Sequence, residues 1–472
     1  MKIEQIYTGC LAQGAYYIES EGEVAIVDPL REVKPYIEQA ERAGATIKYV
    51  LETHFHADFV SGHVDLAQKT GATIVYGPNA QTGFAAHIAK DGEELTLGKL
   101  TIRVLHTPGH TMESTCYLLI DEAGGEKALF SGDTLFIGDV GRPDLAQKSD
   151  LTVTDLAGHL FDSLRNKIMT LPNDVIVYPA HGAGSACGKN MSKETTDTLG
   201  NQKLFNYALR ANMTRDEFIY EVTDGLLAPP KYFPQNVQMN KQGYESIDTV
   251  LSRGTQPLSP DAFEAAANET GALVLDVRAA QVFANGFIPN SINIGLSGQF
   301  APWVGALIPD VRQELLLVCD PGQEQETLTR LARVGYDQVM GYLQGGFSAW
   351  EASDKEVDRV TSISADTLAN LLDGGNVPVI DVRKPGEFTA EHIDGAKSIP
   401  LDFISEQMAE FPKDETIYLH CAGGYRSMMA ASILKARGYD NVIDVAGGFA
   451  AIKATGRFKT TDYVCPSTLA KS

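Results

Sequence analysis

The chain has 472 residues, with 61 acidic and 39 basic side chains and a formal net charge of −22. Its length corresponds to about three domains, and its charge argues against nucleic acid or an anionic membrane as a partner. No apolar run is long enough for a transmembrane helix, and the N-terminus lacks the basic and then apolar run of a signal peptide. The six cysteines are too scattered for a disulfide framework. We therefore expect a cytoplasmic protein with free thiols.

The first half of the chain is predicted to contain short strands that end in polar residues. Four apolar runs end this way: residues 47–51, 101–105, 128–130 and 175–178, which precede His54, His106, Asp133 and His181. Polar side chains at strand ends are typical of sites built on a sheet. A helical stretch is predicted over residues 194–227, followed by a proline-rich covering arm at 229–234.

The second half contains an internal repeat. Three short segments occur twice: Asp-Val-Arg at 276–278 and 381–383, Gly-Tyr-Asp at 335–337 and 438–440, and Gly-Gly-Phe at 345–347 and 447–449. Each copy alternates β-rich runs (315–318; 416–419) with helical segments (324–334; 427–437), which predicts a small α/β domain with a parallel sheet. The predicted domains are residues 1–245, 246–358 and 359–472.

Coordinating side chains are clustered in the first half. Residues 54–59 (His-Phe-His-Ala-Asp-Phe) bring two imidazoles and a carboxylate into a loop after a predicted strand, and His110, Asp133 and His181 follow. Imidazole and carboxylate are the ligands that intermediate divalent metals prefer. A single histidine at a strand end is usually a satisfied polar residue, but this ordered set favours a metal site.

The order of these residues resembles the signature of the metallo-β-lactamase superfamily, which is His-x-His-x-Asp-His, then a histidine, a bridging aspartate and a last histidine. The resemblance covers the first predicted domain and implies a four-layer αββα fold. Phe59 stands where the superfamily has a histidine ligand of a second metal. Because a phenyl ring cannot coordinate, a two-metal hydrolase such as a glyoxalase II-type thioesterase should be impaired.

The remaining residues resemble the persulfide dioxygenase branch of the superfamily, as do residues 132–137 (Gly-Asp-Thr-Leu-Phe-Ile) and 141–144 (Gly-Arg-Pro-Asp). This resemblance implies one Fe(II) per chain, bound by two histidines and a carboxylate with open positions opposite: His54, His110 and Asp133. It further implies three residues that surround the metal and hydrogen-bond water or substrate there: His56, Asp58 and His181.

Two further residues of the first domain have alternative roles. Arg142 either orients and binds a carboxylate of the substrate or forms a structural ion pair with Asp144. Cys187 lies six residues after His181 in a glycine-rich segment. It therefore either enters the metal pocket as a persulfide carrier or is a buried structural thiol.

In the last domain, Cys421 begins a loop between a predicted strand and a predicted helix. Backbone N–H groups in such a loop form an anion cradle that binds substrate; its residues are Ala422, Gly423, Gly424 and Tyr425, and Arg426 adds positive charge. A thiolate there is a competent nucleophile toward sulfane sulfur, and the same amides stabilise the persulfide anion. The loop and the upstream Asp-Val-Arg segment resemble the rhodanese family.

The middle copy has Cys319 in the corresponding region, but its loop is acidic and contains a proline. The helix register aligns Val318 with Cys421, whereas alignment of the two cysteines puts Glu324 where Arg426 stands. In either alignment a thiolate would be repelled rather than stabilised. We therefore interpret this copy as a degenerate rhodanese used for packing, docking or dimerisation, with a redox-active Cys319 as the alternative.

The whole layout resembles multidomain bacterial persulfide dioxygenase–sulfurtransferases of sulfide detoxification. The resemblance implies that Fe(II) and O2 oxidise a persulfide of glutathione, coenzyme A or a similar thiol to sulfite. Cys421 would then transfer sulfane sulfur to sulfite, giving thiosulfate, and the tether would keep the two sites at high effective concentration. The alternatives are a glyoxalase II-like thioesterase with an attached sulfurtransferase, and a non-catalytic sulfur-binding relay. We expect a homo-oligomer, and neither nucleic acid nor a membrane as a partner.

Overall fold

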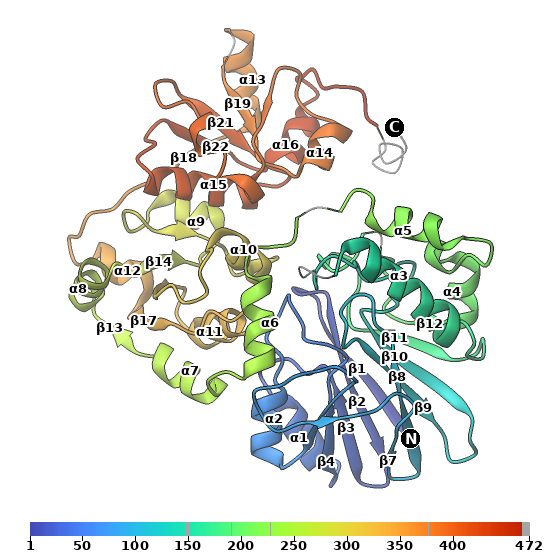
Figure 1. The fold of residues 1–472 in the computed structure, drawn as a ribbon. Coiled ribbons are helices and arrows are strands. Elements are labelled where there is room, and N and C mark those ends of the chain that lie inside the picture. Colours follow the sequence, from blue (N-terminus) through green and yellow to red (C-terminus); the bar gives the residue numbers. More distant parts are fainter. Residues whose placement is uncertain (147–150, 190, 227, 376, 465–472) are drawn as a thin grey trace. The chain divides into compact units, whose positions relative to one another are not determined.

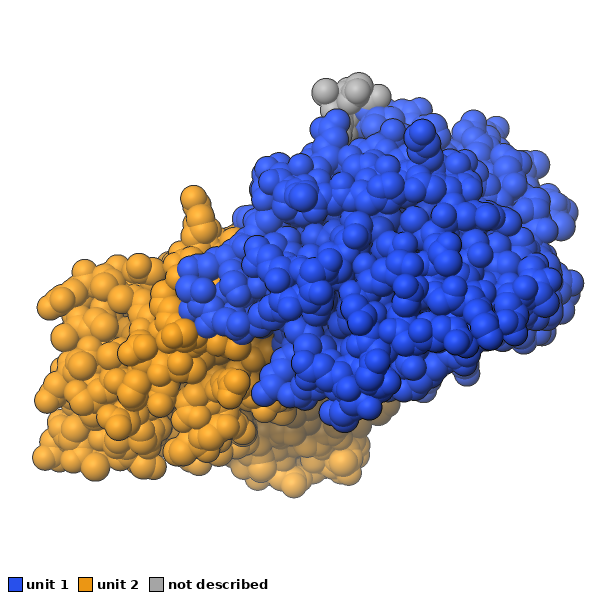
Figure 2. Space-filling view, turned by 90° about the horizontal axis from the view of Figure 1, so that it is seen from below, with its two compact units in different colours: residues 1–249, 331–336 blue, residues 250–330, 337–472 orange. Residues whose placement is uncertain are grey.

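The computed structural model describes residues 1–146, 151–189, 191–226, 228–375 and 377–464. They divide into two units, which Figure 2 shows in separate colours. The first unit comprises residues 1–249 with 331–336, and the second comprises residues 250–330 and 337–472. The finer domain boundaries at 245 and 358 stay predictions.

Two six-stranded sheets form the centre of the first unit (Figure 1). From edge to edge, the first sheet contains β1 (Lys2–Thr8), β2 (Gln13–Ser20), β3 (Glu23–Val27), β4 (Thr46–Leu51), β5 (Thr73–Tyr76) and β6 (His87–Ile88). The second contains β12 (Asp197–Thr198), β11 (Ile176–Pro179), β10 (Glu126–Gly132), β9 (Thr115–Ile120), β8 (Leu100–His106) and β7 (Glu94–Leu97). The four predicted strands correspond to β4, β8, β10 and β11.

Both faces of each sheet are apolar. In β2, Tyr16 belongs to the core between the two sheets, whereas the next residue, Tyr17, belongs to the core on the outer face. In β9, Tyr117 and Leu118 divide in the same way. Because successive side chains of a strand point to opposite faces, each sheet needs an apolar layer on both sides.

Helices provide the outer layers. α1 (Lys34–Arg42) and α2 (His63–Thr70) cover the first sheet with Tyr36 and Leu66. α3 (Val153–Ser163), continued by a π-helical turn (Leu164–Ile168), and α5 (Arg215–Thr223) cover the second with Leu160 and Phe218. The predicted αββα fold is thereby confirmed. Among the described residues, no helix combines the length and the apolar character that crossing a bilayer requires.

The prediction of one helical stretch over residues 194–227 is wrong. The segment is divided into β12, α4 (Leu199–Phe205), a 3-10 turn (Tyr207–Leu209) and α5. Asn206 and Thr214 break it, because their side chains accept hydrogen bonds from the N–H groups of Ala208 and Glu217 and so start new helical segments. The proline-rich arm also ends early, since α6 (Phe233–Gln242) has its proline in the first turn, where proline is tolerated. α7 (Ile247–Gly254) follows.

Two five-stranded parallel sheets repeat one strand order in the second unit. The first contains β13 (Pro257–Leu258), β17 (Val339–Leu343), β16 (Leu315–Val318), β14 (Leu273–Asp276) and β15 (Ile292–Asn293). The second contains β18 (Thr361–Ile363), β22 (Val442–Val445), β21 (Ile417–His420), β19 (Val379–Asp381) and β20 (Lys397–Ser398). The two predicted parallel α/β copies are confirmed.

The helices of the two copies also correspond. The middle copy has α8 (Pro260–Thr270), α9 (Ala280–Asn285), α10 (Phe300–Leu307), α11 (Glu324–Arg333) and α12 (Gly346–Glu351). The last copy has α13 (Ala365–Asp373), α14 (Pro385–Ala390), 3-10 turns (Leu401–Phe403; Met408–Glu410), α15 (Tyr425–Ala436) and α16 (Gly448–Thr455). One core lies beneath α8 and α12, with Phe263 and Trp350, and its counterpart lies beneath α13 and α16, with Leu368 and Ile452.

Candidate metal centre and cysteine loop

Three strand ends of the first unit bring His54, His110 and Asp133 together. They follow β4, β8 and β10, and all three side chains are buried. One ligand atom from each lies within 4.8 Å of the other two. Asp133 Oδ2 is 3.4 Å from His110 Nε2 and 3.8 Å from His54 Nε2. The three predicted iron ligands therefore converge, and their binding of iron stays a prediction.

Neighbouring groups orient the two imidazoles. His110 Nδ1 lies 2.8 Å from the carbonyl oxygen of Arg142, to which it donates. His54 Nδ1 lies 3.0 Å from the hydroxyl of Thr53, which itself donates to Asp28. Because the Nδ1 atoms are used in this way, the Nε2 atoms are directed toward Asp133. Such outer hydrogen bonds fix the tautomer and orientation of metal-binding histidines.

The charge states of His54 and Asp133 fit a divalent cation. Burial, with a smaller contribution from His56, lowers the pKa of His54, so its ring is neutral. Burial raises the pKa of Asp133, but His181 and His54 more than reverse this, and the net pKa is well below its usual value. Asp133 Oδ2 is buried and has no hydrogen-bond partner among the described residues. A buried, ionised oxygen facing two imidazoles is the environment that a bound metal ion satisfies.

His181 lies between two carboxylates instead of facing this trio. Its Nδ1 donates to Asp133 Oδ1 at 2.8 Å, and its Nε2 lies 2.8 Å from Asp58 Oδ2. Burial lowers the pKa of His181, but Asp133 and Asp58 raise it well above the usual value. The ring is therefore an imidazolium, which has no free electron pair for a metal.

Phe59 fills the remaining position of a second metal site. Its side chain is fully buried, and its ring centroid lies 4.3 Å from that of His56 and 6.4 Å from that of His181. Its carbonyl oxygen accepts a hydrogen bond from Asn240 of α6. The position next to Asp58 thus has a phenyl ring, which cannot coordinate a metal, and an imidazolium, which would first have to lose a proton.

The structure brings Cys187 into this region. Its sulfur lies with ligand atoms of Asp58 and His181 inside a 4.8 Å group. Burial, followed by the charges of Asp58 and Asp133, raises the pKa of the thiol well above its usual value. The thiol is therefore protonated near neutral pH, which disfavours it as a nucleophile. Its part as a sulfur carrier stays a prediction.

Arg142 has the ion pair that the sequence offered as an alternative. Its guanidinium donates two hydrogen bonds of 2.6 Å to Asp144 and one of 3.2 Å to the carbonyl oxygen of Ala186. Its own carbonyl oxygen orients His110. The structure thus ties Arg142 to the metal centre through its backbone, and contact of its side chain with substrate stays a prediction.

Sequence reasoning missed the groups beneath this site. His56 Nε2 lies 3.1 Å from Asp28 and 3.8 Å from Glu52, so the ring faces buried carboxylates. Asn240 donates to the carbonyl oxygens of His56 and Phe59, which holds the loop of residues 54–59. Asp28 directly follows β3, so the rule that strands end in polar residues could have identified it. Asn240 had no such signal, because it is 184 residues away from His56.

Cys421 directly follows β21, at the start of the loop that leads into α15. The thiol is buried, and the N–H of Gly424 donates to its sulfur at 3.1 Å. Gly424 has φ of 95°, a left-handed conformation that glycine adopts without strain. Ala422 is half-buried, Gly423 is exposed, and Tyr425 opens the helix. One N–H of the predicted amide cradle therefore donates to the sulfur, and binding of substrate by the loop stays a prediction.

Arg426 is held by a residue that sequence reasoning missed. Its guanidinium makes two ion-pair hydrogen bonds to Glu387 of α14, at 2.6 Å and 2.8 Å. Burial lowers the pKa of Arg426, but Glu387 and, to a smaller extent, Cys421 raise it above its usual value. The predicted positive charge near the sulfur is present, but a carboxylate shares it.

The middle copy has the same loop with an inactive arrangement. In the parallel ladders, Asp276 pairs with Val318 as Asp381 pairs with His420, so Cys319 takes the place of Cys421. Gly322, with φ of 93°, corresponds to Gly424. Its N–H donates to the carboxylate of Glu324 at 2.9 Å instead of to sulfur.

Burial and nearby carboxylates, Glu324 first, raise the pKa of Cys319 to about 12. The structure therefore decides for the alignment of the two cysteines and supports the degenerate interpretation. Of the other cysteines, Cys10, Cys116 and Cys187 are free, and Cys465 lies outside the described residues.

Comparisons with known proteins agree with the division of the chain into a first domain and two repeated copies. The family description "Metallo-beta-lactamase superfamily" matches residues 8–181, and "Rhodanese-like domain" matches residues 259–353 and 364–455. A solved metallo-beta-lactamase structure from Staphylococcus aureus has a TM-score of 0.64 and 32% identity, over 73% of this chain and 98% of that one.

Two curated hydrolases are also similar to parts of the chain. The hydroxyacylglutathione hydrolase of Brucella anthropi is 38% identical over 144 residues, which is 30% of this chain and 50% of that protein. The cytoplasmic hydroxyacylglutathione hydrolase of Arabidopsis thaliana is 34% identical over 186 residues, or 38% of this chain and 67% of that protein. The chain thus spans about half to two thirds of the length of these relatives.

Proposed function

The chain belongs to the metallo-β-lactamase superfamily and carries two rhodanese-like domains, and on that basis we propose that it is a non-haem Fe(II) persulfide dioxygenase coupled to a sulfurtransferase. The substrate is the persulfide of a low-molecular-weight thiol, such as glutathione or coenzyme A. O2 and water convert its outer sulfur to sulfite and release the free thiol, and Cys421 passes a further sulfane sulfur to sulfite, which gives thiosulfate.

The buried phenyl ring of Phe59 is the observation that carries this proposal. Together with the raised pKa of His181, it weighs against a second metal beside Asp58 and supports a single metal at His54, His110 and Asp133. Two histidines and one carboxylate with open positions are the ligand set of non-haem Fe(II) oxygenases. Hydrolases of this fold that use two metal ions need a ligand where Phe59 stands.

The protein groups of the metal centre have separate tasks in this mechanism. When bound, Fe(II) supplies the activation of O2 and of the substrate sulfur. His54, His110 and Asp133 supply two neutral ligands and one negative charge. His181 holds a proton between Asp133 and Asp58, so it can donate a hydrogen bond without competing for the metal. Phe59 excludes water from the side next to Asp58.

The geometry around Cys421 supports the proposed transfer of sulfur. Its thiolate attacks the outer sulfur of R–S–SH, the S–S bond of the donor breaks, and the electron pair leaves with R–S⁻. The N–H of Gly424, already 3.1 Å from the sulfur, stabilises the resulting anionic persulfide. Sulfite then attacks the outer sulfur of Cys421–S–S⁻, which releases thiosulfate and restores the thiolate.

Two single variants test the proposal. His110→Ala should abolish O2 uptake with glutathione persulfide and reduce bound iron, and it should leave sulfur transfer from thiosulfate to cyanide intact. Cys421→Ser should have the opposite effect. The wild-type protein, purified anaerobically, should contain one iron per chain by elemental analysis. Two zinc ions per chain with thioester hydrolysis and no O2 uptake would contradict the proposal.

The second candidate function is a metal-dependent thioesterase with an attached sulfurtransferase. Similarity to two hydroxyacylglutathione hydrolases supports it, and Phe59 weighs against it. A glutathione thioester distinguishes the two functions directly, because only the hydrolase releases free thiol from it without O2. A protein that turns over neither the persulfide nor the thioester would instead be a sulfur-binding relay.

A further inference from the structure

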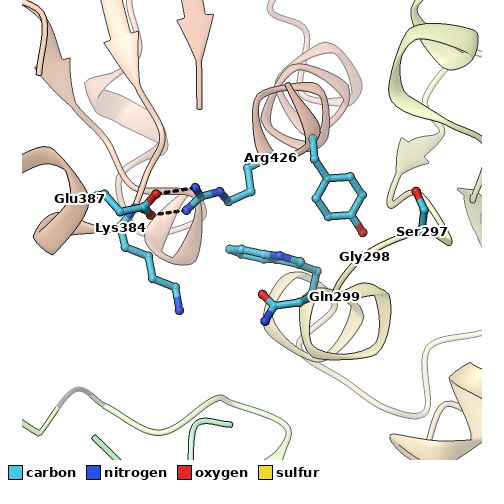
Figure 3. Close-up of a pocket in the computed structure, with 8 residues that line it drawn as sticks. Ser297, Gly298, Gln299, Lys384, Glu387 and Arg426 are labelled. Carbon is cyan, nitrogen blue, oxygen red and sulfur yellow. Dashed lines mark hydrogen bonds and ion pairs between the residues drawn. The ribbon is translucent and has the colours of Figure 1, made fainter. Parts of the chain in front are cut away.

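A cleft lies between the two rhodanese-like copies in the second unit (Figure 3). Its volume is about 580 Å³. The middle copy supplies residues 297–299 and Trp303 of α10, and the last copy supplies Lys384, Glu387, Tyr425 and Arg426. Tyr425 and Arg426 form the first turn of α15, directly after the loop that holds Cys421. The cleft therefore lies next to the sulfur-transfer loop and has one wall from the degenerate copy.

Direct hydrogen bonds between the copies hold these walls together. The hydroxyl of Tyr425 donates to the carbonyl oxygen of Gly295 at 2.7 Å. Further along α15, the hydroxyl of Ser432 accepts from the N–H of Asn293 at 2.9 Å. Because both bonds join α15 to the segment around β15, the degenerate copy fixes the helix that follows the Cys421 loop.

The charges in the cleft do not cancel. Arg426 and Glu387 form an ion pair with each other. Lys384 is exposed and, within the described part of the chain, has no ion-pair partner. Figure 3 shows its side chain beside that pair, with the ammonium directed away from it. A ligand in the cleft therefore meets one unpaired positive charge, two aromatic side chains and residues 297–299.

The geometry points to this cleft as the binding site for the organic part of the thiol persulfide, with Lys384 pairing with an anionic group of the carrier thiol and Trp303 packing against its apolar part. This inference rests on the proposed sulfur transfer at Cys421. Sites of a few hundred cubic ångströms enclose organic molecules, whereas thiosulfate fills a small part of such a volume. The degenerate copy thus contributes specificity to the active one.

Two donors that differ in charge test the contact with Lys384. Sulfur transfer to sulfite is measured anaerobically in the full-length protein, so that the dioxygenase does not consume the donor. Glutathione persulfide carries carboxylates, and cysteamine persulfide carries an ammonium group. Lys384→Gln should raise KM for glutathione persulfide about fivefold, as expected for loss of one exposed charge pair. It should leave kcat and the KM for cysteamine persulfide unchanged.

Lys413→Gln is the matched control, because Lys413 is an exposed lysine of the same copy that does not line the cleft. Trp303→Leu keeps an apolar side chain in α10, and it should raise KM for both organic donors. It should not change KM for thiosulfate, which is measured with cyanide as the acceptor. The inference would be overturned if, for each donor, KM were the same in the wild type, in Lys384→Gln and in Trp303→Leu. Cys421→Ser distinguishes failure of this inference from failure of the proposed function. If Cys421→Ser retains sulfur transfer, the proposed function of the Cys421 loop is wrong.

Discussion

Replacing Phe59 by histidine should convert the one-metal centre into a two-metal centre. The change puts an imidazole into a fully buried position next to Asp58. Without metal, the new ring nitrogens lack assured partners, and an unsatisfied buried polar group costs about 1 to 3 kcal/mol. For a unit of this size, each kcal/mol corresponds to a fall in Tm of about 2 to 4 °C.

Zinc should recover this loss in Phe59→His. Free metal at a hundred times its Kd stabilises the folded state by about 2.7 kcal/mol, which is comparable with the cost of the substitution. His181 must give up its proton to become a ligand, and its pKa is raised by Asp133 and Asp58 against the effect of burial. Proton and metal compete for the same nitrogen, so binding of the second metal should strengthen as the pH rises.

Elemental analysis and thermal unfolding with and without zinc measure these effects, and an oxygen electrode follows the loss of the proposed dioxygenase activity. Phe59→Leu is the matched control, because it also removes the ring but supplies no ligand. It should be destabilised, retain one metal and show no recovery with zinc. If Phe59→His still binds one metal between pH 6 and pH 9, Phe59 is not what prevents the second site, and the reasoning is refuted.

Three further predictions concern single contacts. Glu387→Gln removes the ion pair with Arg426. Because this ion pair is partly exposed and screened by solvent, the free energy of unfolding at pH 7 should fall by about 0.5 to 1 kcal/mol. Burial raises the pKa of Glu387, but Arg426 lowers it overall. The contribution of the ion pair to stability is therefore present above the usual glutamate pKa and is lost as the pH falls through the lowered pKa. If urea unfolding shows the same difference between variant and wild type at pH 7 and at pH 3, this prediction is wrong. Cys319, with a pKa of about 12, is a thiolate in about one molecule in ten thousand at pH 8. Iodoacetamide should therefore label Cys319 more slowly in the wild type than in Glu324→Gln. Equal labelling rates by mass spectrometry would contradict this. Asn240→Ala should cost about 1 to 3 kcal/mol and reduce bound iron, because the loop of residues 54–59 loses the two hydrogen bonds that the Asn240 amide donates. Unchanged iron content would argue against that support.

Contacts between neighbours along the chain were predictable from the sequence. The order of imidazoles and carboxylates in residues 54–59, and the cysteine followed by glycines at 421–424, define ligands and a cradle over a few residues. The apolar runs before them identified β4, β8, β10 and β11. These features depend on local backbone geometry, which a short segment encodes by itself. The prediction of one helix over residues 194–227 was wrong because it did not use two local signals, Asn206 and Thr214.

The amino-acid sequence by itself determined the fold family and the repeat, and it predicted the metal ligands and the nucleophile. Only the tertiary structure decided how these groups are paired. The ladder register aligned Cys319 with Cys421, and the fold of the last copy put Glu387 of α14 against Arg426 of α15. The placement of His181 between Asp58 and Asp133 gave it the charge that removes it from the ligand set. Such pairings join residues far apart in the chain, and the burial that sets their pKa values exists only after the core has formed.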